Sequence, residues 1–296
     1  VATLLGCKPH EVVVASTGVI GVRLDMPSIL VGASTAHRAL GRGDEVDASA
    51  ARAIMTTDTV PKMATVDAGG ARFGGIAKGA GMLAPQLATM LVFLTTDAVV
   101  DPEEFQNVLA KVCDVTFSRV DSDACMSTND TVIAMASGAC GISLTGDELT
   151  DALTKLCAIL ARQLVADAEG SRHDVKVAVT GATSTEAAVA VAREVTRSNL
   201  VKTAVAGNDP NWGRILAAVG CVREDVAPFD PDQVDVSING IQVCKAGGIG
   251  EDRNLVDMGP REVHIDIELH AGHAEAAVWT NDLTHQYVEE NSAYTS

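Results

Sequence analysis

A glycine-rich stretch in the first third of the sequence places the strongest constraint on the fold. It runs from Gly74 to Gly81, contains Lys78, passes Pro85 and leads through Thr89 into a β-rich apolar segment. Because glycine adopts backbone conformations that other residues avoid, we expect a loop that closely approaches a charged group. Three kinds of site use such a loop: a phosphate loop, a dinucleotide loop, and an approach to a nucleophilic threonine.

The sequence disfavours the first two kinds of loop. A phosphate loop of the G-x-x-x-x-G-K-[ST] type needs a hydroxyl after the lysine, and Gly79 follows Lys78 here. Residues 79–84 fit the dinucleotide pattern G-x-G-x-x-A, but that motif requires a helix that opens within the loop. The segment 89–96 is instead rich in β-formers and has no helical periodicity.

Thr89 itself is the subject of the third interpretation. A threonine hydroxyl becomes an effective nucleophile when a base lies beside it, and an N-terminal α-amine can be that base. The reference pKa of this amine is about 7.7–8.0, so a large fraction is neutral near that pH. This interpretation requires cleavage between Ala88 and Thr89. A purely structural strand threonine remains the alternative on these residues alone.

Composition and charge narrow the class of protein. The formal charge is −17, which argues against nucleic acid and anionic membranes as partners because both attract surfaces rich in Lys and Arg. No apolar run reaches the length of a membrane span, and we expect no signal segment. Seven scattered cysteines without a C-x-x-C pair indicate reduced thiols of a cytoplasmic protein. No zinc motif is present, so we expect no metal.

Hydrophobic patterns predict a mixed α/β chain in two parts, with a polar seam at 168–173. The Asn239–Gly240 pair between two late strands is the strongest hairpin signal. Expected helices are 34–40, 45–55, 101–113, 145–167 and 184–196, and expected strands are 11–15, 59–66, 72–76, 174–180, 233–238, 241–245 and 262–269.

Motifs along nearly the whole chain resemble those of the ornithine acetyltransferases, also called glutamate N-acetyltransferases, of arginine biosynthesis. In the order of that family they are STGVIG at 16–21, TTDT at 56–59, GGIAKGAGMLAP at 74–85, ATML at 88–91, STND at 127–130, DPNWGRIL at 209–216 and ENSAYTS at 290–296.

The resemblance implies a self-processing enzyme. Members of the family cleave themselves before the threonine that matches Thr89, between Ala88 and Thr89 in this chain. The freed threonine takes an acetyl group from N-acetylornithine and passes it to glutamate, which yields ornithine and N-acetylglutamate. The family's oxyanion hole matches Thr17 and Gly18. The residues that match its substrate contacts are Thr56, Lys78, Thr89, Glu169, Asn291 and Ser296.

The residue types suit these substrates. Lys78 offers a positive charge to an α-carboxylate, and Glu169 is an acceptor for the side-chain amine of ornithine. Asn291 and Ser296 belong to the C-terminal tail, which must fold back over the pocket if they bind substrate. The resemblance implies no resident cofactor, and it leaves open whether acetyl-CoA is an additional acyl donor.

The fold that the resemblance implies is a layered α/β sandwich like that of the N-terminal-nucleophile hydrolases, with a second α/β domain. We expect residues 1–170 to hold the nucleophile and the oxyanion hole, and residues 171–296 to complete the substrate pocket. The two cleavage products are expected to associate, as a heterotetramer.

Two departures and two alternatives accompany this interpretation. The family has additional chain before the position of Val1, and it usually has proline where Asp25 stands.

One alternative is a related aminopeptidase or amidohydrolase with an N-terminal nucleophile, in which water replaces glutamate. The other is a non-catalytic small-molecule binding protein on the same fold.

Overall fold

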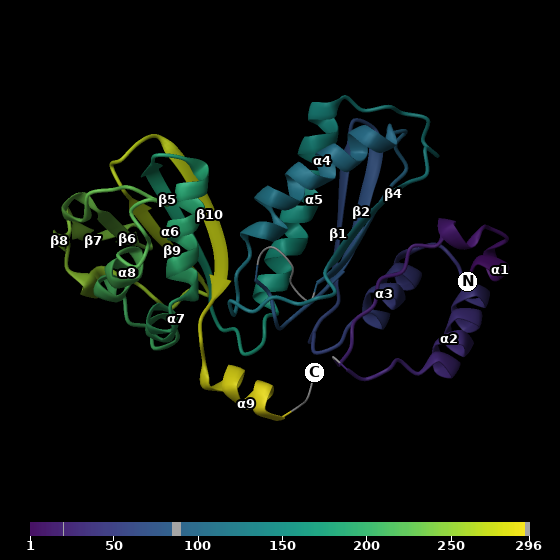
Figure 1. Cartoon of the computed structure of the whole chain (residues 1–296), viewed down its shortest axis with the longest axis horizontal. Coiled ribbons are helices and arrows are strands. Elements are labelled where there is room, and N and C mark those ends of the chain that lie inside the picture. Colours follow the sequence, from purple (N-terminus) through teal and green to yellow (C-terminus); the bar gives the residue numbers. More distant parts are fainter. Residues whose placement is uncertain (20, 85–89, 294–296) are drawn as a thin grey trace.

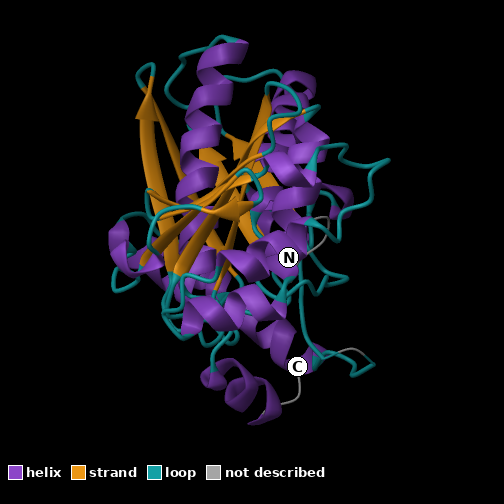
Figure 2. Cartoon of the chain, turned by 90° about the vertical axis from the view of Figure 1, so that its left-hand side faces the viewer, coloured by secondary structure: helices purple, strands orange, loops and turns teal. Residues whose placement is uncertain are grey.

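Two β-sheets with packed helices form the body of the molecule (Figure 1). The computed structural model describes residues 1–19, 21–84 and 90–293, and both sheets lie within these ranges. One sheet has the strand order β1-β2-β3-β4, and the other has the order β10-β5-β9-β6-β7-β8. Helices pack against the strands in layers (Figure 2). This is the mixed, layered α/β class that the sequence predicts.

The four-stranded sheet contains most of the glycine-rich stretch. It consists of β1 (Lys62–Ala68), β2 (Ala71–Lys78), β3 (Leu91–Thr96) and β4 (Thr131–Ala136). A Gly69–Gly70 turn with φ of 58° and 85° joins β1 to β2, and positive φ at both positions suits a tight hairpin. β2 pairs antiparallel with β3, and β3 pairs parallel with β4. Only the last part of the glycine-rich stretch therefore leaves the sheet.

Two helices pack beside this sheet and begin where the sequence predicts. α4 (Pro102–Val115) starts after Asp101, whose side chain accepts hydrogen bonds from the N–H groups two and three residues later. α5 (Gly146–Ala166) starts with a capping box between Thr145 and Glu148. The buried stripe of α5 packs on β1 and β2. The end of α5 is thereby fixed at the edge of the sheet where β2 ends.

The six-stranded sheet follows α5 and holds the second core. Its strands are β5 (Asp174–Ala182), β6 (Asp235–Ile238), β7 (Ile241–Lys245), β8 (Gly248–Ile249), β9 (Glu262–Glu268) and β10 (Ala274–Asn281). β5 and β9 are parallel, and the other pairs are antiparallel. The Asn239–Gly240 turn joins β6 to β7 with positive φ at both residues, which confirms the predicted hairpin.

Four helices accompany this second sheet in the described part of the chain. α6 (Thr185–Arg197) packs on β5 and β10 and is flanked by α7 (Asn199–Ala206) and α8 (Trp212–Val219). α9 (His285–Ala293) follows β10 and crosses back toward the first sheet (Figure 1). No helix in the described ranges combines the length and the hydrophobicity needed to cross a membrane.

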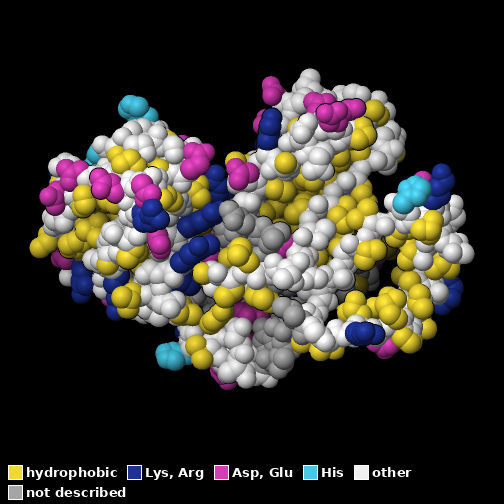
Figure 3. Space-filling view, viewed as in Figure 1, with side chains coloured by type: hydrophobic (Ala, Val, Ile, Leu, Met, Phe, Trp, Pro, Cys, Tyr) yellow, Lys and Arg dark blue, Asp and Glu magenta, His cyan; other side chains and the backbone are white. Residues whose placement is uncertain are grey.

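The N-terminal segment differs most from the expectation. Its helices are α1 (Ala2–Leu5), α2 (Met26–Arg38) and α3 (Asp44–Ala53). The strand predicted at 11–15 is wrong, because Glu11 ends a short 3₁₀ helix (Pro9–Glu11) and residues 12–15 pair with no described strand. Val13 is 70% exposed, and hydrophobic side chains lie openly over this part of the molecule (Figure 3).

The start of α2 is also different from the prediction. The helix begins at Met26 rather than at residue 34, directly after Asp25. Asp25 accepts a hydrogen bond from the hydroxyl of Ser28 in the first turn. Asp25 therefore occupies the N-cap position of this helix.

Two hydrophobic cores lie on either side of the predicted seam. One cluster of buried residues lies within 71–168, and the other lies within 175–278. Trp279 of β10 packs against the first cluster, and the guanidinium carbon of Arg162 lies 3.4 Å from the centre of its ring. The boundary that the sequence predicts at residues 170–171 falls between the two clusters.

Candidate active site

Lys78 lies at the end of β2, and its side chain is buried. Its backbone pairs with Leu91 at the start of β3, so the loop between them begins and ends at neighbouring positions of the sheet. Lys78 is 1% exposed. The predicted cleavage site, Ala88 and Thr89, belongs to this loop and lies outside the described residues. The glycine-rich loop therefore returns to the sheet beside Lys78.

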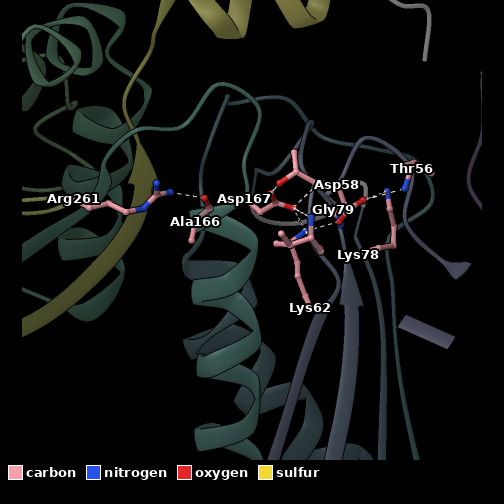
Figure 4. A network of polar contacts seen from close by, with 10 residues as sticks. Thr56, Asp58, Lys62, Lys78, Gly79, Ala166, Asp167 and Arg261 are labelled. Carbon is pink, nitrogen blue, oxygen red and sulfur yellow. Dashed lines mark hydrogen bonds and ion pairs between the residues drawn. The ribbon is translucent and has the colours of Figure 1, made fainter. Parts of the chain in front are cut away.

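Asp58 anchors the chain around Lys78 (Figure 4). Its Oδ1 accepts hydrogen bonds from the N–H of Gly79 and from Nζ of Lys62, both at 2.6 Å. Its Oδ2 accepts one from the N–H of Thr56 at 3.1 Å and lies 4.0 Å from Nζ of Lys78. Burial alone would raise the pKa of Asp58, but the bonds from Gly79 and Lys62 and the charge of Lys62 hold it below its usual value. An ionised carboxylate thus connects two predicted substrate contacts.

Lys62 continues this network to the end of α5. Its Nζ lies 2.6 Å from Oδ2 of Asp167, and Lys62 is 1% exposed. Asp167 also accepts hydrogen bonds from the hydroxyl of Thr59 and, at 3.0 Å, from its N–H. A buried ammonium between two carboxylates satisfies the rule that buried charges are paired. The segment that precedes Glu169 is therefore tied to the loop that holds Asp58.

Glu169 lies against the glycine-rich loop. Its N–H donates to the carbonyl of Ala80 at 3.0 Å, and a Cβ added to Gly81 would be 2.7 Å from its Oε2. The side-chain amide of Asn291 on α9 donates to the same Oε2 at 2.9 Å. Glu169 is 5% exposed. The tail therefore reaches back to the loop, as the sequence predicts, and the absence of a side chain at Gly81 leaves room for the carboxylate.

The predicted oxyanion residues are tethered to the turn at 127–130. The side-chain amide of Asn129 donates to the carbonyl of Ser16 at 2.9 Å, and Ser16 directly precedes Thr17 and Gly18. Gly18 is exposed and Thr17 is partly buried. The loop that carries these two donors is thus held by a polar side chain from a segment more than a hundred residues later.

Asp130 in the same turn contacts the start of β3. Its Oδ1 accepts a hydrogen bond from the N–H of Met90 at 2.8 Å, while its buried Oδ2 has no hydrogen-bond partner among the described residues. Burial raises the pKa of Asp130 to about 6, although the bond from Met90 and the charge of Lys78 oppose this rise. A carboxyl group whose pKa lies near neutral pH therefore binds the residue that directly follows Thr89.

The electrostatic surroundings of Lys78 combine burial with several carboxylates. Burial lowers the pKa of Lys78, whereas Asp58, Asp130 and Glu169 act to raise it and Lys62 acts to lower it. Three acidic side chains thus offset part of the cost of burying this ammonium group, and its pKa stays below the ordinary value. The site therefore offers a cation and a carboxylate on the two sides of one loop.

Lys202 attaches the second sheet's helices to the segment before the 127–130 turn. Its Nζ donates to the carbonyls of Ser122 and Asn281, both at 2.5 Å, and to the hydroxyl of Thr280 at 2.9 Å. Burial lowers the pKa of Lys202 to about 8, and Asp121 is the leading group that opposes this change. This buried lysine fixes the second part of the chain against the first.

Four predicted substrate contacts lie around the glycine-rich loop: Thr56, Lys78, Glu169 and Asn291. Three predicted site residues, Ala88, Thr89 and Ser296, lie outside the described residues. The catalytic roles of all these residues stay predictions.

The sequence interpretation missed the groups that connect these contacts, which are Asp58, Lys62 and Asp167. Asp58 belongs to the TTDT motif and could have been singled out, whereas Lys62 and Asp167 resemble ordinary surface charges. Among the described residues, no group of three or more His, Cys, Asp or Glu side chains is arranged to hold a metal ion.

A protein-family model, the ArgJ family, matches residues 1–296. This chain belongs to the ArgJ family. An arginine biosynthesis bifunctional protein ArgJ from Bifidobacterium longum (strain NCC 2705) is 52% identical over 298 residues, which cover 100% of this chain and 76% of that protein. ArgJ from Mycobacterium leprae (strain TN) is 48% identical over 289 residues, which cover 97% of this chain and 70% of that protein.

A solved ArgJ structure also matches the fold. The crystal structure of arginine biosynthesis bifunctional protein ArgJ from Bacillus halodurans has a TM-score of 0.64 and 34% sequence identity. The match covers 68% of this chain and 98% of the solved chain. ArgJ membership confirms the family resemblance and the layered α/β fold predicted from the sequence motifs.

Proposed function

We propose that this chain transfers an acetyl group from N-acetylornithine to glutamate through an acetyl ester of Thr89. ArgJ membership confirms the class of enzyme expected from the sequence, an acetyltransferase of arginine biosynthesis. One observation carries the proposed site: the buried side chain of Lys78 lies where the loop that leads to Thr89 begins, and the buried carboxylate of Glu169 lies against that loop.

The two charges match the two ends of ornithine. Lys78 pairs with the α-carboxylate that donor and acceptor share, and Glu169 accepts hydrogen bonds from the side-chain ammonium. Asn291 orients the carboxylate of Glu169 through its 2.9 Å hydrogen bond. Asp58 joins Thr56 to the end of β2, because it accepts hydrogen bonds from the N–H of Thr56 and from the N–H of Gly79, which follows Lys78. This charge pattern favours a free amino acid as substrate.

Self-cleavage comes first in the proposed mechanism. The Oγ of Thr89 attacks the carbonyl carbon of Ala88 and the C–N bond between the two residues breaks. The nitrogen takes up the proton that the hydroxyl loses and becomes a free α-amine. Water then hydrolyses the resulting ester, which leaves a carboxylate on Ala88 and an N-terminal threonine.

Acetyl transfer follows with the new α-amine as the base. It accepts the hydroxyl proton of Thr89 while Oγ attacks the acetyl carbon of N-acetylornithine, and Thr17 and Gly18 donate hydrogen bonds to the oxyanion. The C–N bond then breaks, ornithine leaves with the proton, and the acetyl group stays on Thr89. The amine of glutamate attacks this ester, and the hydroxyl of Thr89 regains its proton. The two half-reactions predict ping-pong kinetics.

We further propose that the two cleavage products stay together and form a heterotetramer. β2 of residues 1–88 pairs with β3 of residues 89–296 at six successive positions, and α5 packs on β1 and β2 across the same division. The solved ArgJ chain matches 68% of this chain, a share close to that of the 208 residues from 89 to 296. Gel filtration after cleavage, with both products in one peak of four chains, is the expected result.

Acetyl-CoA is proposed as a second acyl donor, with no resident cofactor. The curated ArgJ proteins are named bifunctional, which supports a second activity. Initial rates with acetyl-CoA and glutamate test this point directly.

A cytoplasmic location is supported by the free thiols of all seven cysteines.

The deciding experiment compares the wild type with Thr89→Ala and Thr89→Ser by intact mass and N-terminal sequencing. Wild type should yield a fragment that begins at Thr89, Thr89→Ser should also be cut, and Thr89→Ala should remain whole. Only the cut forms should release ornithine from N-acetylornithine in the presence of glutamate. An uncut wild type, or acetyl transfer by Thr89→Ala, would contradict the proposal.

The two alternatives make different predictions in the same assay. An aminopeptidase or amidohydrolase would release acetate with water as acceptor, at a rate that glutamate does not change. A non-catalytic binding protein would remain uncut and would bind N-acetylornithine without turnover.

A further inference from the structure

The buried Asp58–Lys62–Asp167 network has no role in the chemical steps of the proposed reaction. Lys62 and Lys78 are both 1% exposed, and Asp58 is 7% exposed. Burying charges disfavours the folded state unless the pairing is very good, and apolar side chains of similar size are often at least as stable. Stability alone therefore does not explain these charges, whereas a role in positioning the neighbouring groups does.

Each arm of the network ends at a predicted substrate contact or within two residues of one. Asp58 binds the N–H of Thr56 and the N–H of Gly79, which directly follows Lys78. Lys62 bridges Asp58 to Asp167, with 2.6 Å on both sides. Asp167 lies two residues before Glu169.

The end of α5 is fixed from the other side as well. The guanidinium of Arg261 donates to the carbonyl of Ala166 at 2.5 Å and also pairs with Asp174 (Figure 4). The stretch from Ala166 to Glu169 therefore has little freedom to move relative to the sheet. A change in the network should move Lys78 more readily than it moves this stretch.

We propose that Asp58 is a positioning residue that sets the separation between Lys78 and Glu169, and so selects the length of the amino-acid substrate. The inference rests on the proposed function. Lys78 receives the α-carboxylate and Glu169 receives the distal ammonium, so their separation measures the carbon chain between these groups. An acyl donor with one more methylene, N-acetyllysine, is rejected because its two ends do not fit a fixed separation.

The charge of Asp58 has a second effect on Lys78. The charged groups around Lys78 are Asp58, Asp130 and Glu169, which favour its protonated form, and Lys62, which disfavours it. Removing Asp58 leaves Lys78 closer to neutral at a given pH. Removing Lys62 has the opposite effect, because a second ammonium group then no longer competes with Lys78 for the carboxylate of Asp58.

The experiment compares Asp58→Asn with Lys62→Met, and uses Asp167→Asn as the matched control. Asp167→Asn also removes one carboxylate from Lys62, but it leaves Asp58 bonded to Gly79 and near Lys78. For each protein we would measure kcat and KM with N-acetylornithine and N-acetyllysine, and kcat/KM against pH. The rate at which a lysine-selective reagent labels Lys78, followed by peptide mass spectrometry against pH, adds a readout that does not depend on activity.

Asp58→Asn should raise KM for N-acetylornithine by about 10- to 100-fold, with kcat nearly unchanged. Its preference for N-acetylornithine over N-acetyllysine should fall by about tenfold. The alkaline limb of kcat/KM and the labelling profile should both shift to lower pH in Asp58→Asn, by about one unit. In Lys62→Met both should shift to higher pH. Asp167→Asn should keep the wild-type preference and pH profile.

Shifts of the pH profile in opposite directions for the two variants distinguish a positioning effect from a general loss of structure. A shift in the same direction for Asp58→Asn and Lys62→Met, or an equal effect of Asp167→Asn, would overturn the inference. If Asp58→Asn fails to fold, the upward shift in Lys62→Met still decides the point. A wild type that does not transfer acetyl groups would refute the proposed function, whereas the labelling profiles would still test the effect of Asp58 on Lys78.

Discussion

Asp130 should lower the stability of the uncleaved chain at neutral pH. Burial raises its pKa from 3.8 to about 6, so between these two values the folded chain binds more protons than the unfolded chain. The stabilising effect of the protonated carboxyl is therefore fully present below pH 3.8. It is lost as the pH rises through about 6. Above that pH, the folded protein holds a carboxylate in surroundings that disfavour it.

The expected magnitude follows from the size of this shift. A rise of about two units corresponds to roughly 3 kcal/mol, at about 1.36 kcal/mol per unit. Solvent reaches part of the residue, so a value of about 1–2 kcal/mol is more reasonable. Asp130→Asn keeps an oxygen acceptor for the N–H of Met90 and removes the charge. It should raise the free energy of unfolding by about 1–2 kcal/mol near neutral pH.

The assay is urea unfolding of Asp130→Asn and its parent at several pH values. Both proteins should carry Thr89→Ala, because that change is expected to keep the chain whole and to remove any effect of cleavage. The gain in stability should shrink to near zero below about pH 4. Equal stability at neutral pH, or a gain that is the same at all pH values, would refute the reasoning.

Three further changes test other contacts of the site. Gly81→Ala places a Cβ 2.7 Å from Oε2 of Glu169, so KM for N-acetylornithine should rise at least about tenfold, with unfolding little changed; an unchanged KM would mean that this carboxylate does not bind the donor. Asn291→Ala removes the hydrogen bond to Glu169 and should raise the same KM by about 5- to 15-fold, whereas Ser292→Ala on the same helix should not. Lys202→Met removes the buried ammonium that joins the two parts and should lower the free energy of unfolding by about 3 kcal/mol at neutral pH. Because burial lowers the pKa of Lys202 to about 8, wild type should gain stability relative to Lys202→Met as the pH rises above 8, and parallel curves would contradict this account.

The local signals in the sequence predicted local structure well. The capping box at Thr145, the N-cap at Asp101 and the Asn239–Gly240 turn each depend on residues within one turn of each other, and each is confirmed. The strand predicted at 11–15 failed because a strand also needs a neighbour, which the residues of the strand itself do not specify.

The site shows the same limit. The resemblance led to Lys78 and Glu169, whose residue types suit the substrate. The bonds that hold them together join residues far apart in sequence, such as Lys62 and Asp167, which are separated by 105 positions. A lysine at the start of a strand usually lies in solvent, and only the packed structure makes Lys62 a buried link.

The contact between Asn291 and Glu169 also has a consequence for the order of events during synthesis. The two residues are 122 positions apart, so the ribosome adds Asn291 well after Glu169. At ~5–20 residues per second, roughly 6–24 seconds separate the two additions. The sheet that holds Lys78 can form during that interval, but the wall that α9 provides cannot. A nascent chain therefore has an open binding site, and a stop codon before Asn291 would leave it open permanently.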